Sequence, residues 1–230
     1  IAISRLSDIE NRNVVPSVFK LYSLCAIYRL DSAEVLRWYG VGVLVRSLLG
    51  RVDDALRDAR AALALAQAAG APPLLAKAHL MMLLAALAAR DPALSRTHLA
   101  EAALHIDPAN AIDTTTYEFQ RAILALLDGD WTGALRLMRA AVASGSDSGW
   151  PLREHIALLG QALAAAETGD FAEAEDALAR AFAHRFYAMC RWHHWIAALI
   201  EARLAERRGQ RERCAAALRR GFAVARGHGY

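Results

Sequence analysis

The chain has 230 residues, of which 56% are hydrophobic and 7% aromatic, and its formal net charge is +3. This length suits one sizeable domain, and the many Ala and Leu residues, both strong helix formers, favour an all-α fold. The most apolar run, Leu80 to Ala89, has ten residues, whereas a membrane span needs about 20. We therefore expect no membrane-spanning segment and no membrane partner.

Residues 1–31 are expected to form a helical lead-in, because apolar residues recur with helical spacing near 16–30. Asp31 and Ser32 then give an N-cap signal for the next helix. Because the first residue is Ile1 rather than Met, we interpret the chain as a fragment of a longer protein.

From residue 32 onward, the sequence repeats five times with a period of 39 to 40 residues. The repeats are marked by a short turn that starts at Gly50, Arg90, Gly129, Gly169 and Gly209. A small residue lies twelve positions after the start of each turn; these residues are, in order, Ala62, Ala102, Ala141, Ala181 and Gly221. Another small residue lies five positions after the start of each turn; these residues are, in order, Ala55, Ser95, Ala134, Ala174 and Cys214. Such columns indicate helices in close contact, and repeats of this length are typical of a solenoid.

Each repeat is predicted to hold two antiparallel helices, helix A before the turn and helix B after it. The A helices are expected at about 32–49, 73–89, 112–128, 150–168 and 187–208. The B helices are expected at about 51–69, 92–106, 131–144, 171–184 and 210–227. Segments rich in Gly, Pro and Ser separate consecutive pairs, and no segment alternates like a strand. Residues 32–230 should therefore form a single all-α domain, a right-handed α–α superhelix of about five helix pairs.

The B helices resemble the tetratricopeptide repeat, in which a Gly-Asp-aromatic turn is followed by Ala, a large apolar residue and Ala. The pattern stands here as Gly129-Asp130-Trp131 with Ala134, Met138 and Ala141, and as Gly169-Asp170-Phe171 with Ala174, Leu178 and Ala181. The A helices depart from the family, since polar Glu118 and Arg121 stand where large apolar residues are expected. Which face of helix A lines the groove of the solenoid is therefore left open.

Longer repeats of this kind resemble the sensor arms of MalT-like and LuxR-type bacterial transcriptional regulators, which are signal-transduction ATPases. The segment 216–230 is similar to part of such regulators. The resemblance implies a cytoplasmic signal-transduction module that binds a small effector or a protein partner in its groove, and that reaches DNA only through a separate domain. The alternative is a protein–protein docking scaffold without a small effector.

The densest chemical cluster is Arg191-Trp192-His193-His194-Trp195 in the fifth A helix. Stacked A helices would bring it close to the start of the fourth, so the candidate binding residues are Trp150, Arg153, His155, Arg191, Trp192, His193 and Trp195. Two interpretations stay open: a ligand-binding patch, or Trp residues that pack against neighbouring helices while the histidines cap polar edges. His193 and His194 are adjacent and point about 100° apart, so they cannot share a metal as an i,i+4 pair could. We predict no metal site, cofactor or catalytic residue, and motifs typical of enzymes are missing.

The C-terminal part is basic, with eleven Arg and three Glu from Arg180 onward. It could bind nucleic acid or an acidic partner, or form a solvated face with pairs such as Glu201–Arg208. The second interpretation is favoured, because no exposed aromatic residues alternate with the arginines. Three cysteines without metal-ligand or redox spacing fit a reducing cytoplasm.

Overall fold

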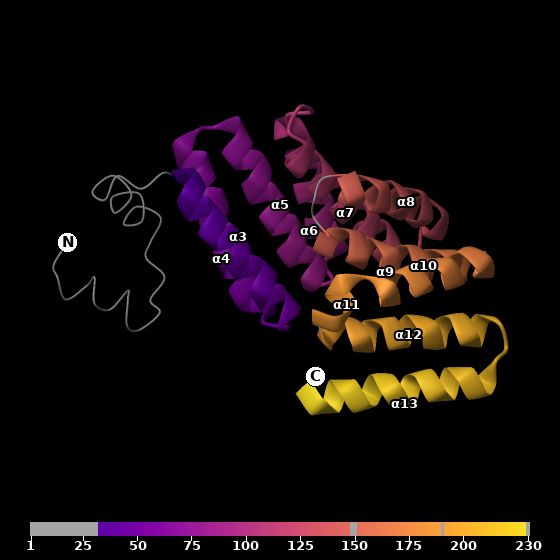
Figure 1. Cartoon of the computed structure of the whole chain (residues 1–230). Coiled ribbons are helices and arrows are strands. Elements are labelled where there is room, and N and C mark those ends of the chain that lie inside the picture. Colours follow the sequence, from indigo (N-terminus) through magenta and orange to yellow (C-terminus); the bar gives the residue numbers. More distant parts are fainter. Residues whose placement is uncertain (1–31, 148–150, 190, 229–230) are drawn as a thin grey trace. The chain divides into compact units, whose positions relative to one another are not determined.

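The structure is a computed structural model that describes residues 32–147, 151–189 and 191–228 (Figure 1). Within these ranges the chain is all-α, as predicted, with eleven helices and no strand. The chain folds as two compact units, Ile1–Asp107 and Pro108–Tyr230. The lead-in predicted over residues 1–31 lies outside the described residues.

Over its described residues, 32–107, the first unit has four antiparallel helices in two pairs. They are α3 (Ser32–Leu48), α4 (Val52–Ala69), α5 (Pro72–Ala88) and α6 (Pro92–His105). Each helix packs on the next, and α3 also packs on α5, so the two A helices lie against each other. Leu65 and Leu83 are among the fully buried side chains of this unit. The unit thus has an apolar core of its own.

The described residues of the second unit form three helix pairs and one short extra helix, which can be followed in Figure 1. They are α7 (Ala111–Asp128), α8 (Trp131–Asp147), α9 (Pro151–Thr168), α10 (Phe171–Ala183), α11 (Arg185–Met189), α12 (Arg191–Arg207) and α13 (Arg211–His228). The A helices pack on one another in the order α7, α9 and α12. Met138, Leu158 and Leu204 lie at the centre of a continuous apolar core.

All five predicted turns start with a residue of positive φ. Their first residues, Gly50, Arg90, Gly129, Gly169 and Gly209, have φ between +54° and +86°. Glycine is favoured there because a left-handed residue ends an α-helix and lets the chain reverse. In three of the turns the next residue is an Asp that caps helix B by accepting a hydrogen bond from a backbone N–H, namely Asp91, Asp130 and Asp170. The Gly-Asp pair therefore both ends one helix and starts the next.

The columns of small residues lie where the helices press together. All five residues at the twelfth position are buried, as are four of the five at the fifth position. The exception is Cys214, which is half-buried and carries a free thiol. At Gly221 a Cβ atom would lie 3.3 Å from the Cβ of Ala198, so α13 approaches α12 as closely as side chains allow.

Two predicted boundaries differ from the structure by more than one residue. Helix α8 continues to Asp147, past the predicted end at residue 144. Ser144 is accommodated because its hydroxyl donates to the carbonyl of Ala141 within the same helix. The fifth A helix was expected at 187–208, but the chain forms the separate short helix α11 before α12 begins at Arg191.

Candidate functional site

Four of the seven candidate residues have described side chains. Trp150 lies outside the described residues, as do the side chains of Arg191 and Trp192, whose backbone begins α12. The other four are Arg153 and His155 on α9 and His193 and Trp195 on α12.

His155 and His193 meet in the interior of the second unit. Their ring centroids are 4.5 Å apart, and both side chains are fully buried. The two rings come from α9 and α12, which pack directly on each other. At these two residues the start of α9 therefore lies against the start of α12, which is the contact expected between the fourth and fifth A helices.

Further aromatic and imidazole rings surround this pair. The ring of His184 lies 5.2 Å from that of His155, and the ring of Tyr187 lies 6.2 Å from it. Tyr187 in turn stacks on His194, with centroids 4.1 Å apart. We call His155, His184, Tyr187, His193 and His194 the histidine cluster. Its members come from α9, from the α10–α11 junction, from α11 and from α12.

Hydrogen bonds determine the protonated nitrogen in two of these rings. Nδ1 of His184 accepts from the backbone N–H of Phe186 at 3.3 Å, so in the neutral ring Nε2 carries the proton. That Nε2 lies 3.7 Å from a carboxylate oxygen of Glu154. In His194, Nε2 donates to the carbonyl of Tyr187, since a carbonyl can only accept. These bonds hold the short helix α11 against α9 and α12.

Burial keeps the two central histidines uncharged at neutral pH. Together with smaller contributions from the nearby His184 and His194, it lowers the pKa of His155 from 6.5 to about 4. Burial also lowers the pKa of His193 to about 4, with an added contribution from His155, while a backbone group of Phe186 acts in the opposite direction. The centre of the cluster is thus a pair of neutral imidazoles in an apolar core.

His155 is unusual because neither of its ring nitrogens has a hydrogen-bond partner among the described residues. A neutral imidazole has one N–H donor and one acceptor nitrogen, and burying both without partners is unfavourable by about 1–3 kcal/mol for each group. Native proteins leave few such groups, and those that remain often face a water molecule or a ligand. The arrangement can therefore offer one donor and one acceptor to a small polar group.

The other two described candidates lie apart from this pair. Arg153 is buried and donates to the hydroxyls of Thr115 and Thr116, so it ties α9 to α7. Burial lowers the pKa of Arg153. Trp195 is half-buried on α12, and its carbonyl lies 3.7 Å from the position that a Cβ at Gly221 would take. Trp195 thus belongs to the contact between α12 and α13.

Ion pairs cover much of the basic C-terminal surface. Arg213 and Arg220 both contact Glu201, and Arg208 contacts Glu175 of α10. The predicted pair Glu201–Arg208 is therefore wrong. The reason is that α12 ends just before Arg208, and the turn directs this side chain toward α10.

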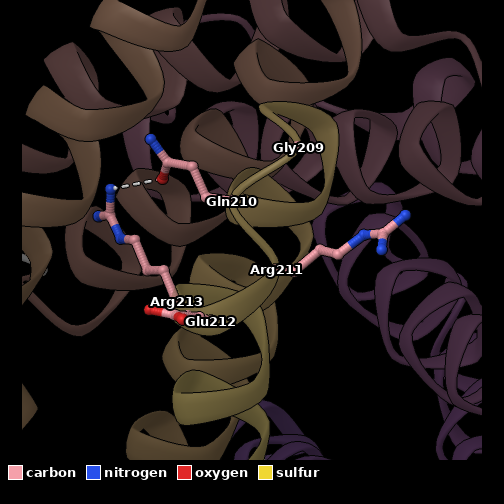
Figure 2. A pocket seen from close by; sticks show the side chains of 5 residues that line it. All are labelled: Gly209, Gln210, Arg211, Glu212 and Arg213. Atoms are coloured by element: carbon pink, nitrogen blue, oxygen red, sulfur yellow. Dashed lines mark hydrogen bonds between the residues drawn. The ribbon is translucent and has the colours of Figure 1, made fainter.

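A shallow depression lies at the turn between α12 and α13 (Figure 2). It is lined by five consecutive residues, Gly209, Gln210, Arg211, Glu212 and Arg213. Figure 2 shows Arg211 pointing away from Gln210 and Arg213, which are joined by a hydrogen bond of 3.3 Å. Because one turn alone forms this depression and it contains none of the candidate residues, we do not assign the binding site to it.

The sequence was compared with protein-family models and with curated proteins, and the fold with solved structures, and no match was found in any of the three. Among the helices that the structure describes, none combines the length and the apolar character needed to cross a membrane.

Proposed function

We propose that this chain is a binding module of the helical-repeat type, which senses a small effector through the histidine cluster. The observation that carries the proposal is His155, whose two ring nitrogens lie fully buried without a partner among the described residues. A small polar molecule that entered this contact would satisfy both nitrogens and would bridge α9 and α12. Its binding would thereby favour one arrangement of the two A helices.

We further propose that the module is the cytoplasmic sensor arm of a bacterial transcriptional regulator. This part rests on the resemblance of the repeats to the arms of MalT-like and LuxR-type proteins. It is supported by the five turns that each start with a residue of positive φ, since a regularly repeated turn is typical of solenoid proteins, which present extended binding surfaces. DNA would be reached through a separate domain, and the module would have no catalytic activity. A full-length protein without a nucleotide-binding or DNA-binding domain would contradict this part of the proposal.

A ligand screen tests the effector site. Tryptophan fluorescence and thermal melting of the chain are recorded with sugars, amino acids and small peptides, using the five tryptophans as reporters. A specific ligand at 100 times its Kd stabilises the native state by about 2.7 kcal/mol. We expect His155→Leu to abolish that shift and Gln67→Ala, an exposed residue of the first unit, to retain it. A ligand that stabilises both variants equally would contradict a site at the histidine cluster.

The alternative function is a docking scaffold without an effector. It is favoured by a different observation, the exposed side chains of Val41, Leu44 and Val45 on one face of α3. Neighbouring apolar residues on a surface often mark a contact with another protein. A screen in which no compound shifts the melting temperature of the chain would favour this scaffold over the sensor.

A further inference from the structure

A second group of histidines lies in the first unit, where α5 and α6 pack together. His79 on α5 and Glu101 and His105 on α6 each place one potential ligand atom within 4.8 Å of the others. Glu101 and His105 are four residues apart on one helix, so their side chains share a face. We propose that these three residues bind a divalent transition-metal ion, with Zn²⁺ as the ion they suit best.

The donor set suits this class of metal. Two imidazoles and one carboxylate form a common protein site for Zn²⁺, with bonds of about 2.0–2.2 Å. Ligand atoms around a tetrahedral ion of that size lie roughly 3.3 Å apart. The potential ligand atoms of the three residues already lie within 4.8 Å of one another. Small side-chain rotations would therefore bring them to the distance that the ion requires. Ca²⁺ and Mg²⁺ favour sites built from oxygen atoms, whereas imidazole nitrogens suit transition-metal ions. Because His79 and His105 supply nitrogen ligands, the site should prefer a transition-metal ion to Ca²⁺ or Mg²⁺.

The surroundings of the three residues favour binding as well. His79 is buried where α5 and α6 pack together, which holds its ring in place. His105 is half-buried and Glu101 is exposed, so the group is open to solvent on one side. This opening provides a route for the ion and leaves room for a water molecule as a further ligand.

His98 occupies the position of a supporting residue. Its Nδ1 lies 3.0 Å from Nδ1 of His79, and its side chain is buried. In the metal-binding form, Nδ1–H of His79 would donate to Nδ1 of His98, which leaves Nε2 of His79 for the ion and orients its ring. Metal-binding histidines usually hold their second nitrogen in such a hydrogen bond, which positions the ring and raises its basicity. His98 therefore acts through His79 as a positioning residue, without binding the metal itself.

This site is independent of the proposed effector site. It lies in the first unit, whereas the histidine cluster lies in the second. An ion bound here would join α5 to α6 and would stabilise the second helix pair. Failure of the metal proposal would therefore leave the effector proposal untouched, and the reverse also holds.

Metal titration of the whole chain tests the proposal. The chain is treated with a chelator, dialysed and titrated with Zn²⁺ by calorimetry and with Co²⁺ by absorption. Cobalt is a useful probe because its visible spectrum reports the geometry of its ligands. We expect one equivalent to bind and to raise the melting temperature. Absence of binding to the unmodified chain would overturn the proposal.

Variants locate the site. Glu101→Gln and His105→Gln change residues that are exposed or half-buried, so they should fold and should weaken binding at least 10-fold. His98→Ala should weaken it about 10-fold and keep the one-to-one stoichiometry, because it removes only the support of His79. The matched control is His184→Gln in the other cluster, which should leave binding unchanged. Equal binding by Glu101→Gln, His105→Gln and the unmodified chain, or its loss in His184→Gln, would overturn the assignment.

Discussion

Seven of the eight histidines of this chain lie in two groups, one in each unit. In the histidine cluster of the second unit, desolvation lowers the pKa values of His155 and His193 to about 4. The unfolded chain returns these rings to water, where their pKa is near 6.5. Folding therefore opposes protonation of both residues, and stability must depend on pH.

We predict that the free energy of unfolding falls as the pH is lowered from about 6.5 to about 4. In this window the unfolded state binds protons at His155 and His193 and the native state does not. Each ring accounts for a loss of roughly 3 kcal/mol across the window, and above pH 6.5 it contributes no pH dependence. Urea unfolding followed by circular dichroism at a series of pH values measures this dependence.

The variant His155→Leu should remove about half of that dependence. It should also be at least as stable as the unmodified chain at pH 7, since an apolar side chain replaces buried nitrogens without partners. Tyr187→Phe keeps both histidines and is the matched control, with an unchanged slope. A slope that stays the same in His155→Leu would show that other groups cause the dependence.

At this scale the sequence predicted only part of the candidate site. It expected the start of the fourth A helix, with His155, to face the cluster at 191–195, because consecutive A helices stack side by side. It missed His184 and Tyr187, since no periodic pattern marks the α10–α11 junction. It also missed the group in the first unit, although Glu101 and His105 have the i,i+4 spacing of residues on one helix face. His79 comes from another helix, and only the packing of α5 on α6 brings it close to them.

The helix pairs depend on small residues at the fifth and twelfth positions of each repeat. Ala174 and Ala181 on α10 are both fully buried. A methyl group there lets two helix backbones approach closely, and a larger side chain would push them apart. These columns could be predicted from the sequence because they recur at a fixed spacing, as could the turns. The separate helix α11 could not, since it occurs in one repeat only.

We predict that Ala181→Leu destabilises the chain by about 1–3 kcal/mol, because the core has no room for three more carbon atoms. Ala183→Leu is the matched control, since it makes the same change at an exposed position of the same helix. The control should change stability by less than about 0.5 kcal/mol. Thermal and urea unfolding of the three proteins measure the difference. Equal stability of the two variants would mean that the column of small residues does not set the distance between the helices.

Over the whole chain, each unit holds an apolar core of its own. The core of the second unit includes Met138 and Leu158, and the clusters of the first unit include Val43 and Leu65. In repeat proteins stability is approximately a sum of terms within repeats and between direct neighbours. A defect in one core should therefore act most strongly on the helices that pack around the altered residue.

We predict that Leu158→Ala lowers protection from amide exchange in α8–α13 and leaves α4–α6 unchanged. Leu158 is fully buried on α9, and loss of a buried leucine side chain costs about 2–5 kcal/mol. Leu83→Ala on α5 is the reciprocal variant, and it should act on α4–α6 alone. Exchange followed by mass spectrometry at pH 7 resolves the two sets of peptides. Equal loss of protection in all helices would mean that the two units unfold as one cooperative body. In that case an effector bound at the histidine cluster would stabilise the first unit as strongly as the second.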